Sequence, residues 1–277
     1  MQTERELRQQ IVEIGRRIYQ NGFIAASDGN ISARIADNRF LTTPTMVCKG
    51  RMTEDMLVVV DLDGNKIRRD ERNPSSEFAM HREIYRLRPD VHAVVHAHPP
   101  FGTGFAVANV ALDQPLLSEV ILTLGCVPLT GYGTPSTDEL PNSLRPFIPH
   151  HDALLMANHG AVTYGPDLEM AYYRMETLEH FAKITLIARL VGNPKHLPAA
   201  AIEKLLDVRE RAGYMPAESR GCQACGFVQG HSSSCAVGSA TSSYGTRNGE
   251  ETVTLTRREL QALITEAAKL VASEIKH

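Results

Sequence analysis

The segment from Asn73 to Pro99 constrains the fold of this chain more than any other stretch. It contains a Ser-Ser-Glu turn, a helical segment and a short apolar strand that ends in His96-Ala97-His98. Side chains at positions i and i+2 of a strand point to the same face. His96 and His98 are therefore expected to lie side by side, which is the geometry that a divalent metal needs.

Two further groups complete the candidate metal site. Glu77 lies at the start of the helix that returns to this strand, and His159 follows another apolar stretch. Three histidines with an open position are typical of catalytic rather than structural zinc. His92 shares the strand parity and is a rival ligand, but it lies about 13 Å earlier along the strand. His81, on the helix, is expected to be structural.

Composition excludes several classes of protein. The 277 residues are 43% hydrophobic and carry a net charge of -3, which predicts a soluble globular protein without a basic surface for nucleic acid. No apolar run approaches the roughly 20 residues that span a membrane, and the charged N-terminus does not resemble a signal peptide. Three of the five cysteines gather near the C-terminus, unlike a secreted disulfide framework, which indicates a cytoplasmic location.

Short strands alternate with helices over residues 1–215. This pattern predicts a single α/β domain with a central mixed, largely antiparallel sheet flanked by helices. The expected helices are 3–21, 78–85, 102–110, one from 115, 136–148, 168–191 and 202–211. The expected strands are 33–35, 39–43, 57–61, 91–98, 127–130 and 153–158. No dinucleotide-binding or Walker motif and no nucleophile elbow occurs in the sequence.

Two turns are candidate anion sites. Gly29-Asn30 leads into a strand, where glycine lets backbone N–H groups approach a ligand and asparagine adds a donor. Ser75 and Ser76 precede a helix, whose N-terminus attracts phosphate. From these residues alone, a hairpin corner and a pair of helix caps remain open alternatives.

Five motifs in register resemble the class II aldolase/adducin superfamily over roughly residues 5–215: SDGNISAR, TPT, PSSE, HAVVHAH and NHGA. The catalytic branch, represented by L-fuculose-1-phosphate aldolase, keeps the metal histidines, whereas adducin head domains are non-catalytic. The resemblance implies a zinc-dependent aldolase that cleaves a (deoxy)ketose 1-phosphate to dihydroxyacetone phosphate and an aldehyde such as lactaldehyde. It also implies a homotetramer with sites between subunits.

The resemblance assigns roles to individual residues. One Zn²⁺ per subunit would be held by His96, His98 and His159, and Glu77 would contact the metal and transfer a proton. The implied phosphate-binding residues are Gly29, Asn30, Thr45, Ser75 and Ser76.

Three positions depart from the family pattern or align with it loosely. The family's TPTG turn ends here in Met46, so the loop cannot follow the same path if the glycine requires a positive φ. Glu119 stands where the family aldolase has a tyrosine acid, and it is either a catalytic group or a charge at a helix start. Tyr214 lies near the position of the family's C-terminal tyrosine, and either residue is expected to act across a subunit interface.

Other members of the superfamily provide the alternatives. A methylthioribulose-phosphate dehydratase also uses a glutamate, whereas the pentulose-phosphate epimerases tend to carry aspartate at the position of Glu77. A non-catalytic adducin-like binding module is the alternative outside enzymes. The complete set of three histidines and Glu77 argues against it.

The C-terminal region differs in composition from the domain. Residues 216–253 are rich in Gly, Ser and Cys and are expected to form a linker. Residues 254–277 are expected to form an amphipathic helix, which resembles the encapsulation peptides that bind a bacterial microcompartment shell or cargo protein. Self-assembly and simple packing are the alternatives for this helix. Whether the linker binds metal is open for Cys222, Cys225, His231 and Cys235.

Overall fold

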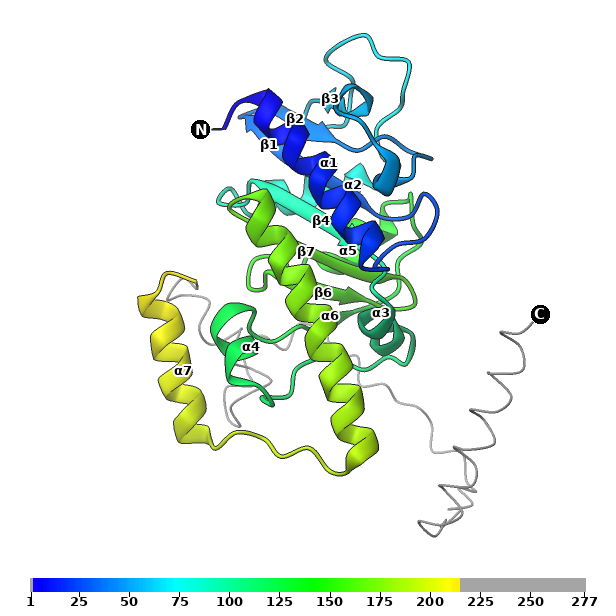
Figure 1. Ribbon diagram of the computed structural model, residues 1–277. Helices are drawn as coiled ribbons and strands as arrows, with labels where there is room; N and C mark the ends of the chain where they lie inside the picture. The colour runs from blue at the N-terminus through cyan, green and yellow to red at the C-terminus, as the bar shows by residue number, and fades with distance from the viewer. Residues whose placement is uncertain (1, 215–277) are drawn as a thin grey trace, which may run out of the picture. The chain divides into compact units, whose positions relative to one another are not determined.

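The computed structural model describes residues 2–214. Their seven strands form one sheet in the order β3-β2-β1-β4-β7-β6-β5 (Figure 1). The β5–β6 pair is parallel and the other pairs of this sheet are antiparallel. The prediction of a mixed, largely antiparallel sheet flanked by helices is therefore confirmed. The expected linker 216–253, the helix 254–277 and the Cys222–Cys235 cluster lie outside the described residues.

The elements alternate along the chain as the sequence predicts. In order they are α1 (Glu4–Gln20), β1 (Asn30–Ala36), β2 (Arg39–Thr42), the 3₁₀ turns η1 (Lys49–Arg51) and η2 (Glu54–Met56), β3 (Val58–Val60), α2 (Phe78–Leu87), β4 (Ala93–Ala97), α3 (Pro100–Val107), α4 (Ser118–Thr123), β5 (Leu129–Thr130), α5 (Glu139–Leu144), β6 (Ala153–Met156), β7 (Gly160–Gly165), α6 (Leu168–Val191) and α7 (Ala199–Arg211).

Strand β4 lies in the middle of the sheet and separates two hydrophobic layers. Ala93, Val95 and Ala97 pack on the face that α1, α3 and α6 cover (Figure 1). Val94 packs on the opposite face, with α2 and α5. Alternation along the strand places His96 on this second face. Helix α2 begins there, directly after Glu77, the candidate proton-transfer residue.

Local sequence explains the two long helices of the first layer. Thr3 and Glu6 form a capping box at the start of α1, and its apolar residues at helical spacing are buried. The Asp167 carboxylate accepts a hydrogen bond from the N–H of Met170 and caps α6 at 2.7 Å. The bounds of α6 confirm the predicted helix 168–191.

Several elements differ from their predicted bounds. The segment Gly160–Gly165, to which the sequence pattern assigned no element, is strand β7. Helix α3 begins at Pro100 instead of Gly102, because proline is well tolerated in the first turn of a helix. Helix α4 begins at Ser118 instead of Pro115, and α5 spans six residues and is shorter than the expected helix 136–148. None of the helices in residues 2–214 is long and apolar enough to cross a membrane.

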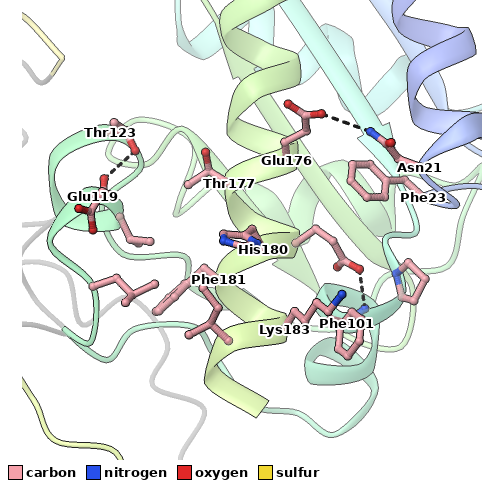
Figure 2. Close-up of a pocket in the computed structure, with 15 residues that line it drawn as sticks. Asn21, Phe23, Phe101, Glu119, Thr123, Glu176, Thr177, His180, Phe181 and Lys183 are labelled. Carbon is pink, nitrogen blue, oxygen red and sulfur yellow. Dashed lines mark hydrogen bonds between the residues drawn. The ribbon is translucent and has the colours of Figure 1, made fainter. Parts of the chain in front are cut away.

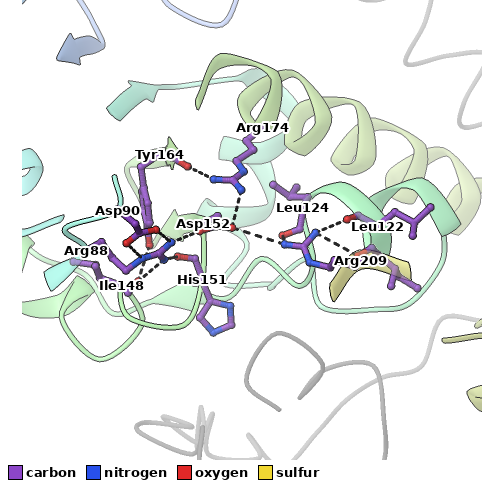
Figure 3. A network of polar contacts seen from close by, with 11 residues as sticks. Arg88, Asp90, Leu122, Leu124, Ile148, His151, Asp152, Tyr164, Arg174 and Arg209 are labelled. Atoms are coloured by element: carbon purple, nitrogen blue, oxygen red, sulfur yellow. Dashed lines mark hydrogen bonds and ion pairs between the residues drawn. The ribbon is translucent and has the colours of Figure 1, made fainter. Parts of the chain in front are cut away.

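A buried ionic cluster attaches α7 to the sheet (Figure 3). The carboxylate of Asp152, which precedes β6, lies 3.0 Å from Arg88, 2.9 Å from Arg174 and 3.8 Å from Arg209. Arg209 lies on α7, is fully buried, and donates hydrogen bonds to the carbonyls of Ile121, Leu122 and Leu124 at the end of α4. Asp152 thus connects α2, α6 and α7 through three guanidinium groups.

Candidate metal and substrate site

Three imidazoles converge at the end of β4. One ring nitrogen from each of His96, His98 and His159 lies within 4.8 Å of the others. His96 is fully buried, and His98 and His159 are partly buried. The predicted ligand set is therefore brought together, although the third histidine comes from the turn between β6 and β7.

A backbone hydrogen bond orients His96, and the Asp28 carboxylate lies beside His98. The Nδ1–H of His96 donates to the carbonyl of Ala161 at 2.9 Å, so Nε2 offers a lone pair when the ring is neutral. Its Nε2 lies 3.2 Å from Nε2 of His98, whose Nδ1 lies 3.6 Å from the Asp28 carboxylate. Burial, with repulsion from the other two imidazoles, lowers the pKa of His98 to about 4. Neutral imidazoles with lone pairs this close fit a bound divalent cation.

Glu77 lies beside the three imidazoles. Its Oε1 is 3.2 Å from His159 Nε2, and its Oε2 is 3.3 Å from His96 Nε2. The amide of Asn30 donates to Oε2 at 2.8 Å. Burial raises the pKa of Glu77, but the neighbouring imidazoles of His96 and His159 hold it well below its usual range. A metal ion at the same place would likewise favour the carboxylate.

The predicted phosphate-binding residues line the same cavity as Glu77, His98 and His159. An isolated β-bridge between Pro44 and Pro74 brings the Thr45 turn beside the serine turn, and the N–H of Ser75 donates to the carbonyl of Thr43. The cavity has a volume of about 240 Å³. Its lining includes Gly29, Asn30, Thr45, Ser75, Ser76, Glu77, His98 and His159.

Two glycines permit this close arrangement. Gly29 has a φ of 69°, and a Cβ there would lie 2.8 Å from the carbonyl oxygen of His96. A Cβ at Gly160 would lie 2.6 Å from the ring of His98. A side chain at either position would displace the metal histidines.

Met46 adopts the left-handed conformation, with a φ of 57°. The sequence left open whether a bulky residue permits this turn, and the structure shows that Met46 accepts the strain. Its side chain is 82% exposed, so little packing depends on it.

Replacing Met46 with glycine is therefore expected to raise the free energy of unfolding by up to about 1 kcal/mol, because an L-residue is strained in this conformation. Urea unfolding measures the change. Met46→Ala is the matched control, since it removes the side chain but keeps the Cβ and the strain. An equal gain in both variants would contradict this explanation.

Sequence reasoning missed two charged residues of the cavity. Lys49 is buried, and its amine donates to the carbonyl of Ser27 at 2.5 Å. Burial lowers the pKa of Lys49 to about 8, against the opposing charges of Asp28, Cys48 and Glu77. Lysine is rarely buried, and no motif marked this one. Asp28 belongs to the SDGN motif, but its contact with His98 could not be deduced from a single sequence.

Three residues considered in the sequence lie outside this cavity. Glu119 lines a second pocket of about 900 Å³ with Thr123, His180 and Lys183 (Figure 2). Tyr214 follows α7 and is 41% exposed. The rival ligand His92 is exposed and lines a third pocket, beside Asp167. Catalytic roles for Glu119 and Tyr214 stay predictions.

A family model and curated relatives match this chain over most of the described residues. A family model described as "Class II Aldolase and Adducin N-terminal domain" matches residues 9–186. The 3-oxo-tetronate 4-phosphate decarboxylase of Escherichia coli (strain K12) is 33% identical over 210 residues, which cover 73% of this chain and 96% of that protein. The L-fuculose phosphate aldolase of Methanocaldococcus jannaschii is 33% identical over 184 residues, which cover 66% and 98%.

The fold is also similar to that of a solved enzyme. The structure of an L-fuculose 1-phosphate aldolase matches with a TM-score of 0.69 at 28% identity, and the match covers 75% of this chain and 96% of that one. These relatives are enzymes, which confirms the prediction of an enzyme. The chain belongs to the class II aldolase and adducin family.

Proposed function

We propose that the protein is a zinc-dependent aldolase that cleaves a (deoxy)ketose 1-phosphate, such as L-fuculose 1-phosphate, to dihydroxyacetone phosphate and an aldehyde. One observation carries the proposal: a single cavity joins two of the three convergent imidazoles, those of His98 and His159, with the Glu77 carboxylate and two donor-rich turns. The turns suit a phosphate, and the imidazoles suit zinc.

The residues of the cavity divide the work of the reaction. A bound metal would polarise the substrate carbonyl and stabilise the charge that develops as the carbon–carbon bond breaks. Glu77 is placed to return a proton to the carbon that loses its neighbour. The backbone at Gly29 and the side chains of Asn30, Thr45 and Ser75 hold the phosphate and so orient the sugar.

Electrostatics favours a neutral leaving group. Asp28 lines the cavity beside His98, and its side chain is 46% exposed. A neutral aldehyde beside this carboxylate would not be repelled, whereas a substrate carboxylate in the same place would be. This favours a ketose phosphate over a sugar acid.

Decarboxylation of a 3-oxo-tetronate 4-phosphate is the second candidate. Several relatives at 32–33% identity carry this name, and the buried cation Lys49 offers attraction for an acidic substrate. The bond that breaks also lies next to a carbonyl carbon, but carbon dioxide leaves in place of an aldehyde.

The expected result of the first assay is zinc-dependent release of dihydroxyacetone phosphate by the full chain. The panel contains fuculose, rhamnulose, 5-deoxyribulose and methylthioribulose 1-phosphates and a 3-oxo-tetronate 4-phosphate. Aldehyde and carbon dioxide are measured separately, so each candidate has its own product. Removal of metal with a chelator is the control. A metal-loaded protein that releases dihydroxyacetone phosphate from no substrate would contradict both candidates.

We further propose a homotetramer in which Glu119 and Tyr214 reach the cavity of a neighbouring subunit. Helix α6 supports association through exposed apolar side chains at Tyr173, Leu186, Ile187, Leu190 and Val191. Light scattering measures the assembly, and a monomer would exclude it.

We also propose that residues 254–277 bind a microcompartment shell or cargo protein in the cytoplasm. Loss of shell association after deletion of 254–277 is its test.

A further inference from the structure

A chain of buried polar side chains lies behind Glu77, between β1 and α2. Tyr85 Oη lies 2.7 Å from Ser32 Oγ, and Ser32 Oγ lies 2.7 Å from His81 Nδ1. His81 Nε2 lies 2.5 Å from Asn30 Oδ1, and Asn30 Nδ2 lies 2.8 Å from Glu77 Oε2. The four residues behind Glu77 are at most 3% exposed. These hydrogen-bonded side chains therefore connect the hydrophobic layer under α2 to Glu77, the predicted proton-transfer group.

The chemistry of each group fixes the direction of the chain. An amide nitrogen can only donate and an amide oxygen can only accept, so Asn30 donates to Glu77 and accepts from His81. A flipped amide would set its oxygen against the Glu77 carboxylate. Burial lowers the pKa of His81 to about 3, so the neutral ring carries its one proton on Nε2. His81 Nδ1 then accepts from Ser32, and Ser32 accepts from Tyr85.

We propose that His81 is a positioning residue, which locks the Asn30 amide so that its nitrogen faces Glu77 and the cavity. This inference rests on the proposed function. Asn30 lines the cavity and also contacts Glu77. The same amide therefore serves both the proposed phosphate-binding residues and the proton-transfer residue. Without the Nε2–H of His81, the amide is free to rotate, and Glu77 loses its fixed donor.

A matched pair of substitutions tests this role. The side-chain nitrogen of glutamine reaches the position of imidazole Nε2, whereas that of asparagine reaches only the position of Nδ1. His81→Gln is therefore expected to keep kcat within about 5-fold of wild type, because it retains the donor to Asn30. His81→Asn is expected to lower kcat on the order of 10²-fold with KM within about 3-fold, a loss within the range of proton-transfer effects. Metal content and thermal unfolding are measured for both variants.

Equal kcat in the two variants would overturn the proposal, because a purely structural histidine does not distinguish the two nitrogens. A second measurement does not depend on a substrate. Nitrogen NMR of the metal-free full chain is expected to show His81 protonated at Nε2, and protonation at Nδ1 would overturn the proposal. If wild type cleaves no phosphate substrate, the proposed function fails. The NMR result still decides the direction of the hydrogen bonds between Tyr85 and Glu77.

Discussion

Exchange of Glu77 for glutamine is expected to lower kcat by roughly 10²- to 10⁴-fold, the range typical for loss of a positioned acid or base. Glutamine has nearly the same shape, and its Oε1 still accepts the hydrogen bond from Asn30. It cannot exchange a proton near neutral pH, so the step that follows bond cleavage fails. The three histidines are unchanged, and metal content is expected to stay close to that of wild type.

Glu83→Gln is the matched control for this prediction. Glu83 lies on the same helix as the residues that follow Glu77, is buried, and pairs with Arg145. Its exchange removes a buried carboxylate outside the cavity, so stability is expected to fall while kcat stays near wild type. Steady-state kinetics with metal analysis measures both variants. Unchanged kcat in metal-loaded Glu77→Gln would show that another group transfers the proton.

The sequence predicts elements well where local signals are strong. Helix α6 has an aspartate cap and a long run without breakers, so its bounds were correct. Strand β7 was missed because all six of its residues are buried and it begins and ends with glycine. A strand that is buried on both faces has no alternation to detect. The strand order depends on pairing between distant segments, which no local pattern specifies.

The same distinction applies to the site. His96 and His98 were paired correctly because alternation along a strand is a local rule. The rule carries no information on burial. His92 has the same parity as His96 and His98, but it is exposed. Lys49 lines the cavity from the start of η1, far from the histidines in sequence. His81 was expected to be structural, and its contact with Asn30 could not be predicted because it depends on how β1 packs against α2.

The Asp152 cluster shows how a buried charge contributes to stability away from the cavity. Asp152 and Arg209 are 3% and 0% exposed, respectively, so neither charge is well solvated. Arg174 lies 2.9 Å from the same carboxylate and also donates to the carbonyl of Tyr164 (Figure 3). Removal of the shared carboxylate from such a cluster leaves the remaining buried charges with less compensation.

Asp152→Asn is therefore expected to lower the free energy of unfolding by about 3–5 kcal/mol, since the guanidinium groups of Arg174 and Arg209 lose their shared carboxylate. Urea unfolding at constant pH measures the loss. Asp90→Asn is the matched control, because Asp90 also pairs with Arg88 but its side chain is 61% exposed. Its exchange is expected to change stability by less than about 1 kcal/mol. Equal losses in the two variants would show that burial of the cluster does not determine its contribution.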